Sequence, residues 1–155
     1  MLPLWMAIDF MNFTYRTNPC ANNVPVPVVM RKGQFSYLDK KMGAGFDLRV
    51  DSVEEGNLQP GTRQAVVVLA CDFPVGGTAA AYLFDERKGA AVLLGQIGSA
   101  DWGPDWGRGP SSIHVRFAKH LLYVDQCDRP ECTGKVRTTY ALRGGKLVRV
   151  PTTKR

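Results

Sequence analysis

Apolar and polar residues alternate with a period of two along much of the chain. In the segment 46–51, Phe, Leu and Val occupy the even positions, and Asp and Arg occupy the odd ones. The segments 113–117 and 135–142 show the same alternation. Because successive side chains of a strand point to opposite faces of a sheet, each segment predicts a strand with one buried and one solvated face, as antiparallel sheets have.

One segment is apolar on both faces. Residues 64–71 read Gln-Ala-Val-Val-Val-Leu-Ala-Cys, and their length and β-branched side chains favour a buried central strand over a helix. The apolar run 91–94 predicts the strand next to it. Shorter runs at 82–84, 122–124 and 147–150 predict further strands.

Short turn segments, rather than crossover helices, separate these runs. The segments 117–121 and 143–146 and a longer loop at 85–89 are each predicted to close an antiparallel hairpin. The segment 24–29 contains two prolines, which donate no amide hydrogen bond, and therefore suits an edge strand or an extended arm.

These patterns predict a mostly β protein with few or no helices. We expect a single-domain antiparallel meander over residues 1–155, with its sheet curved or folded into a sandwich or half-barrel. A short helix would fit only near 20–23 or 39–42. Residues 1–7 are expected to be a flexible N-terminal segment and 151–155 a flexible tail.

Composition narrows the class of protein. The chain has 155 residues, of which 45% are hydrophobic, so it is not disordered and can bury its own core. No apolar run approaches the roughly 20 residues of a membrane-spanning helix. Residues 1–107 hold 9 basic and 11 acidic side chains, whereas 108–155 hold 11 and 3. A basic C-terminal third predicts either a surface for an anionic partner or a face that only aids solubility.

The four cysteines predict covalent cross-links. Cys127 and Cys132 enclose four residues between two predicted strands, a spacing that a hairpin loop can bridge when the Cα atoms lie within about 7 Å. Cys20 and Cys71 then remain to pair. We expect both disulfides, which suit an oxidising compartment. Four reduced thiols and a four-cysteine zinc site are the alternatives, but the spacing differs from that of common zinc sites.

The segment 98–112 is the longest without a strand pattern, so function is expected there. It repeats Asp-Trp-Gly at Asp101 and Asp105. The two aspartates could form a carboxylate pair for glycoside hydrolysis, and Trp102 and Trp106 could either stack on a ligand or cover the core. No nucleophile elbow, phosphate loop or His-Glu-x-x-His helix occurs. We therefore expect a non-catalytic protein without a cofactor, with a glycan-acting enzyme as the alternative.

A possible calcium loop has lost its ligands. The segment 56–66 is similar to the Gly-Asp-Leu-x-Gly-Asp-Gly-x-x-Glu-Ala-Val loop of secreted β-proteins, whose carboxylates can hold calcium. Its acidic positions are here Asn57, Gly61 and Gln64. Because calcium requires oxygen ligands, we expect a polar turn and no metal site.

The candidate binding site combines the loop with the outward, basic side of two predicted strands. It would form if the strands 113–117 and 135–142 belong to one sheet, and it consists of Asp101, Trp102, Asp105, Trp106, Arg108, His114, Arg116, Lys135 and Arg137. Its cations favour anionic envelope polymers or lipid headgroups. The basic third lacks the interleaved aromatic side chains of single-strand binders, which counts against nucleic acid.

Several short motifs resemble the LppP/LprE family of mycobacterial envelope lipoproteins and related secreted domains. The resemblance covers residues 18–151 and rests on Leu83-Phe84-Asp85, Leu94-Gly95, Ile113-x-Val115, Cys127 with Cys132, Thr138-x-Tyr140, Gly145-Lys146-Leu147, and Cys20 ahead of a Val-Pro element. It implies an exported bacterial domain, periplasmic or on the cell surface, with a binding or accessory role. The first residues given hold no cysteine for lipid attachment, so the lipid anchor of the family is not carried over to this chain.

Overall fold

A computed structural model describes residues 8–20, 23–74, 76–97, 110–127, 132 and 134–151. Residues 1–7 and 152–155, which include most of the predicted flexible ends, lie outside this set. The elements are η1 (Phe10–Asn12), β1 (Thr14–Tyr15), β2 (Val28–Val29), β3 (Gln34–Asp39), β4 (Ala44–Gly56), β5 (Gln64–Phe73), β6 (Gly76–Arg87), β7 (Ala90–Ile97), β8 (Ser112–Ala118), β9 (Leu121–Cys127), β10 (Lys135–Arg143) and β11 (Lys146–Val150).

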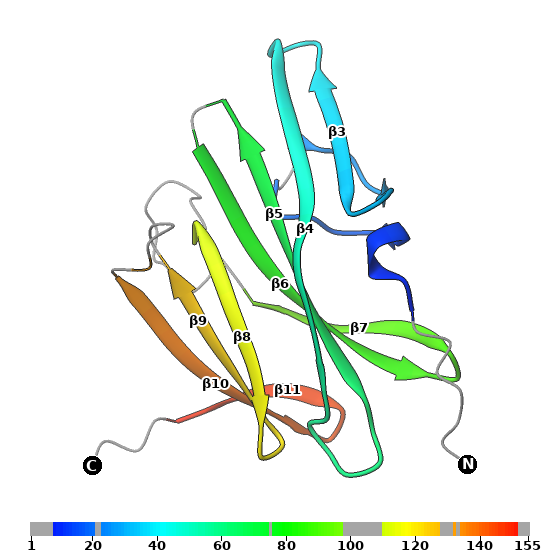
Figure 1. Cartoon of the computed structure of the whole chain (residues 1–155), viewed down its shortest axis with the longest axis vertical. Coiled ribbons are helices and arrows are strands. Elements are labelled where there is room, and N and C mark those ends of the chain that lie inside the picture. The colour runs from blue at the N-terminus through cyan, green and yellow to red at the C-terminus, as the bar shows by residue number, and fades with distance from the viewer. Residues whose placement is uncertain are drawn as a thin grey trace.

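The predicted antiparallel meander is confirmed. Strands β3 to β7 form one five-stranded sheet in chain order, strands β8 to β11 form a four-stranded sheet, and β1 pairs with β2 (Figure 1). Every pairing is antiparallel. The two larger sheets lie face to face, as in a sandwich, and none of the three is closed into a barrel.

Strand β5 lies at the centre of the larger sheet, as its sequence predicted. Its residues from Gln64 to Cys71 are all buried. Alternate side chains enter two separate cores: Val67 and Leu69 face one, while Val66 and Val68 face the other. This explains why the segment is apolar on both faces, since each face of β5 is covered by a further layer.

The layers on either side of the five-stranded sheet differ in kind. One face is covered by residues 8–20 and 23–30, hereafter the N-terminal arm, whose buried side chains include Phe10, Tyr15 and Val28. The other face is covered by the four-stranded sheet through Ile113, Leu122 and Val124. The outer surfaces of the arm and of the four-stranded sheet therefore lie on opposite sides of the molecule.

The predicted neighbour of the central strand was wrong. The segment 91–94 belongs to β7, which pairs with β6, whereas β5 pairs with β4 and β6. Strand β6 is longer than its apolar run 82–84 suggested, because it begins at Gly76 and includes Ala79, Ala80 and Ala81. Alanine is depleted in strands, so this part of β6 gave no strand signal.

The turns follow the expected hairpin chemistry, with one correction. Gly144–Gly145 and Lys119–His120 both have positive φ at two central residues, as the turns of two-residue hairpins require. The predicted loop 85–89 is only the pair Lys88–Gly89, because β6 continues to Arg87 and β7 begins at Ala90.

The helical segments are single turns. Residues 40–43 form the turn between β3 and β4 rather than a helix. Near the other predicted position, the Asn23 amide donates to the Cys20 carbonyl. Helix η1 at Phe10–Asn12 was not predicted, and its first turn is capped by Asp9, which accepts from the Met11 amide.

At Gly56 the two large sheets pack closely against each other. This glycine ends β4, and a Cβ added there would overlap the ring of Phe117 on β8, whose own Cβ would be 2.6 Å away. Strands β4 and β8 are in contact across the two sheets. Glycine is therefore required at this position by close packing rather than by backbone conformation.

Candidate anion-binding face of the four-stranded sheet

Both predicted disulfides are present. Cys20 bonds to Cys71 with the Cα atoms 5.5 Å apart, and Cys127 bonds to Cys132 with the Cα atoms 4.7 Å apart. The first joins the N-terminal arm to β5, and the second closes the connection between β9 and β10. Among the described residues, no three His, Cys, Asp or Glu side chains are arranged to hold a metal ion.

The loop half of the candidate site lies outside the described residues. Asp101, Trp102, Asp105, Trp106 and Arg108 all fall in the segment 98–109. At its end, the Pro110 carbonyl accepts a hydrogen bond from the Ala79 amide of β6.

The strand half of the site lies on one face of one sheet, as the prediction required. His114 and Arg116 are on β8, and Lys135 and Arg137 are on β10. These strands flank β9 in the four-stranded sheet. All four side chains are exposed, while the alternate positions of β8 and β10, such as Ile113 and Leu142, face the core together with Val124 of β9. We call this outward surface the sheet face.

Asp125 of β9 lies in the middle of the sheet face. The register places it directly opposite His114 on one side and Arg137 on the other. The Arg137 guanidinium donates to both carboxylate oxygens, from Nε at 2.7 Å and from Nη2 at 2.8 Å. This bidentate contact lowers the pKa of Asp125, with smaller electrostatic contributions from Lys135 and His114, and it raises the pKa of Arg137.

Arg116 is held by an aromatic ring instead of a carboxylate. Its guanidinium carbon lies 4.7 Å from the centre of the Tyr123 ring, on the neighbouring strand β9. A cation over an aromatic face is attracted to it but keeps its hydrogen-bond donors available. Arg116 can therefore contact a ligand without losing this interaction.

Two further cations of the sheet face were missed by the sequence analysis. Arg143 and Lys146 are directly opposite each other at the ends of β10 and β11, and both are exposed. Arg143 continues the odd-numbered positions of Lys135 and Arg137, so extending the alternation to the end of β10 would have found it. Like charges directly opposite each other are destabilising, and a bound anion would relieve their repulsion.

The sheet face is strongly positive. Of the described residues, five Lys or Arg side chains lie on it with one acidic side chain, Asp125: Arg116, Lys135, Arg137, Arg143 and Lys146. Among them, Arg137 makes the one ion pair that the structure shows. Lys135, Arg143 and Lys146 are exposed cations beside it, and this arrangement suits an extended anion that contacts several strands at once.

The segment 56–66, which resembles a calcium loop, is held closed by hydrogen bonds of the Gln64 side chain. The buried Gln64 accepts from the Leu58 amide at 2.6 Å, and its Nε2 donates to Asp85 and to Thr62, each at 3.0 Å. An amide thus occupies the centre of the turn and satisfies its polar groups. The segment acts as the polar turn that leads into β5.

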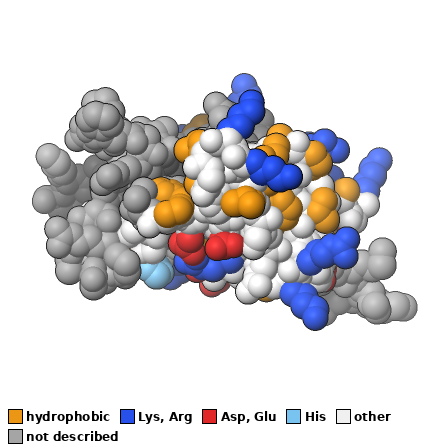
Figure 2. All heavy atoms as spheres, turned by 90° about the horizontal axis from the view of Figure 1, so that it is seen from above, with side chains coloured by type: hydrophobic (Ala, Val, Ile, Leu, Met, Phe, Trp, Pro, Cys, Tyr) orange, Lys and Arg blue, Asp and Glu red, His pale blue; other side chains and the backbone are white. Residues whose placement is uncertain are grey.

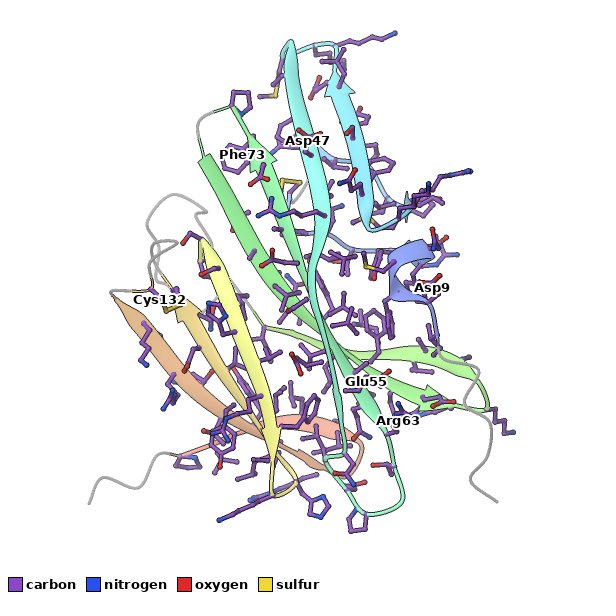
Figure 3. The ribbon with its side chains drawn as sticks, in the orientation of Figure 1. Asp9, Asp47, Glu55, Arg63, Phe73 and Cys132 are labelled. Atoms are coloured by element: carbon purple, nitrogen blue, oxygen red, sulfur yellow. A yellow bond between two sulfur atoms is a disulfide. The ribbon has the colours of Figure 1, made fainter. Side chains whose placement is uncertain are left out.

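Two hollows formed by described residues lie away from the sheet face. One is an open depression of about 300 Å³ lined by Gly45, Asp47, Asp72, Phe73 and Pro74, and Figure 3 labels Asp47 and Phe73 at this end of the molecule. Its carboxylates already accept hydrogen bonds, from Ser36 to Asp47 and from Arg49 to Asp72.

The other hollow lies beside Glu55 and Arg63, which pair at 2.5 Å, and its volume is about 20 Å³ (Figure 3). This is room for about one water molecule, so the sheet face remains the better candidate site.

None of the helical segments that the structure describes is long and apolar enough to cross a membrane.

Comparisons with known proteins found no similar chain: no family model matches, and neither a curated protein nor a solved structure matches. The site is therefore interpreted from its own geometry.

Proposed function

We propose that this chain is an exported, cell-envelope-associated β domain that is not catalytic and binds an anionic envelope polymer on the sheet face. One observation carries the proposal. Cations from β8, β10 and β11 lie on one exposed surface, spaced along strands whose neighbours are about 4.8 Å apart, with Arg116 supported by Tyr123 rather than neutralised. A polymer with regularly spaced negative charges can contact several of them together.

The disulfides and the family resemblance support the cellular setting. Two disulfides are compatible with an oxidising compartment outside the cytosol. The short motifs that resemble the LppP/LprE lipoproteins support a bacterial envelope, periplasmic or on the cell surface. Both lines of support are independent of the charge on the sheet face.

The test removes three cations from the sheet face and compares the result with an equal change of charge elsewhere. The variant Lys135→Gln/Arg143→Gln/Lys146→Gln should bind dextran sulfate at least about tenfold more weakly in calorimetric titration, with a smaller salt dependence. Neutral dextran should bind neither protein. All three side chains are exposed, so the unfolding midpoint should not change.

The matched control is Arg16→Gln/Lys40→Gln/Lys41→Gln, which removes the same three charges from exposed positions on the N-terminal arm and the β3–β4 turn. It should keep nearly the full affinity. If both triple variants lost affinity equally, binding would reflect net charge alone and the proposed site would be rejected.

A further inference from the structure

The exposed apolar side chains are concentrated in one part of the sequence. The described residues expose six large apolar side chains: Met11, Val26, Val29, Leu38, Met42 and Leu93. Five of them lie between positions 11 and 42. Met42 and Leu38, on the β3–β4 hairpin, are the most exposed, at 64% and 60%. Single exposed apolar residues are common, but such a concentration marks an interaction surface.

The same part of the chain is rich in cations. The described residues between 8 and 44 contain Arg16, Arg31, Lys32, Lys40 and Lys41 against two acidic residues. Asp9 accepts from the Met11 amide and the Asn12 side chain, and Asp39 accepts from the Lys41 and Met42 amides. Among the described residues, none of these five cations makes an ion pair.

The neighbouring part of the fold shows a contrasting pattern. In the described part of 45–97, each of the three arginines is ion-paired: Arg49 with Asp72, Arg63 with Glu55, and Arg87 with Asp85. The arginines of the central sheet are thus neutralised within the protein. The lysines and arginines of the arm and the β3–β4 hairpin are instead left for a partner.

These side chains lie on the outer surface of the arm and on the β3–β4 hairpin, two neighbouring parts of the fold. Residues 44–46 of β4 pair with β3 only, because pairing with β5 begins at Asp47, so the hairpin extends beyond the central sheet (Figure 1). Seen from that end, hydrophobic side chains are interspersed with Lys and Arg, while the visible Asp and Glu side chains gather mainly in one place (Figure 2). We call the exposed surface formed by residues 16, 26 and 29 of the arm and by residues 38 and 40–42 at the tip of the hairpin the amphiphilic end.

We propose that the amphiphilic end docks on the surface of an anionic lipid bilayer. Exposed apolar side chains beside unpaired cations match the two components of such a surface: Leu38 and Met42 would enter the boundary between headgroups and acyl chains, while Lys40 and Lys41 would contact anionic headgroups. The charge complementarity distinguishes this partner from a neutral protein surface. Docking is peripheral, and only side chains of a projecting hairpin and the arm are required to enter the lipid.

This surface is separate from the sheet face. The arm and the four-stranded sheet cover opposite faces of the five-stranded sheet, so a domain lying on a membrane through the amphiphilic end would leave the sheet face accessible. The inference therefore goes beyond the proposed polymer binding and can succeed or fail without it.

The test is flotation of the whole chain with vesicles of phosphatidylglycerol and phosphatidylcholine, compared with phosphatidylcholine alone. The unaltered chain should bind the anionic vesicles and dissociate at high salt. Arg16→Gln/Lys40→Gln/Lys41→Gln should bind about a hundredfold more weakly at low salt, because each cation near an anionic membrane contributes about fivefold. Leu38→Ser/Met42→Ser should weaken binding about tenfold.

Matched controls separate docking from general effects. Leu93→Ser changes an exposed apolar side chain outside the amphiphilic end, at 44% exposure on β7, and should bind vesicles normally. Lys135→Gln/Arg143→Gln/Lys146→Gln should also bind normally. The inference is overturned if the unaltered chain does not float with anionic vesicles, if either control loses as much affinity as the matching variant, or if the Leu38 and Met42 changes instead dissociate a dimer in analytical ultracentrifugation.

Discussion

At the scale of single residues, Asp125 has two opposed effects. It stabilises the sheet by accepting two hydrogen bonds from Arg137, and it lowers the positive charge of the sheet face on which both lie. A residue that contributed only to stability would change folding without changing affinity. Asp125 therefore offers a test in which stability and binding move in opposite directions.

We expect Asp125→Asn to destabilise the protein by about 1 kcal/mol at neutral pH and to strengthen binding of dextran sulfate severalfold. The pKa of Asp125 is lowered in the folded state from its ordinary value of 3.8, so its carboxylate stabilises the fold above that value and this stabilisation is lost as the pH falls below it. The variant should lose less stability between pH 5 and pH 3 than the unaltered chain does. Urea unfolding across this range measures the effect.

The control is Asp51→Asn, which makes the same charge change on β4, where Asp51 lies 3.6 Å from Arg49. It should leave dextran sulfate binding unchanged. An equal gain of affinity in both variants would show that net charge, rather than the position of Asp125, controls binding.

At the scale of strands, the alternation of side chains and the hairpins between consecutive strands were predictable, whereas the register of each pair was not. The period of two placed His114, Arg116, Lys135 and Arg137 on outward positions, because side-chain direction in a strand is a local property. That Asp125 lies between them depends on the register of β9 with both of its neighbours. Single-sequence patterns do not contain that register.

The packing of the strands also depends on residues whose role cannot be recognised from the sequence pattern. Gly56 resembles any loop glycine in the sequence, yet it is the position where β4 meets Phe117 of β8. Similarly, the Lys119–His120 turn contains no glycine although both residues have positive φ. Long-range packing overrides local preference at such positions.

We expect Gly56→Ala to destabilise the protein by about 1–3 kcal/mol, because the added methyl group overlaps the Phe117 ring between the two sheets. The matched control is Gly45→Ala on the same strand, where an added Cβ has no atom within 4 Å and should be neutral or slightly stabilising. Denaturant unfolding of both variants gives the comparison. Phe117→Leu should cost less in the Gly56→Ala background than alone, and strictly additive losses would contradict the overlap.

At the scale of the whole molecule, charge follows the three layers. Cations without ion pairs gather on the outer surfaces, at the amphiphilic end and on the sheet face, while the central sheet balances its arginines internally. Binding energy gained on either outer surface is useful only if the layers remain attached to each other. The arm layer contains short strands of two residues each, so its attachment depends on apolar packing and on the Cys20–Cys71 disulfide.

The two disulfides should therefore differ in their effect on stability. Cys20–Cys71 joins residues 51 positions apart, and Cys127–Cys132 joins residues 5 apart. In the chain-entropy model, these closures restrict the unfolded chain by about 4 and about 2 kcal/mol. Cys20→Ala/Cys71→Ala should accordingly lose about twice as much unfolding free energy as Cys127→Ala/Cys132→Ala, as measured in urea.

The same variants test the layered arrangement. Loss of Cys20–Cys71 loosens the arm over the central sheet, so vesicle binding through the amphiphilic end should weaken more than dextran sulfate binding on the sheet face. Loss of Cys127–Cys132, which lies at the end of β9 and β10, should weaken polymer binding more than vesicle binding. Equal effects of both variants on both ligands would mean that the two surfaces are not carried by separate layers.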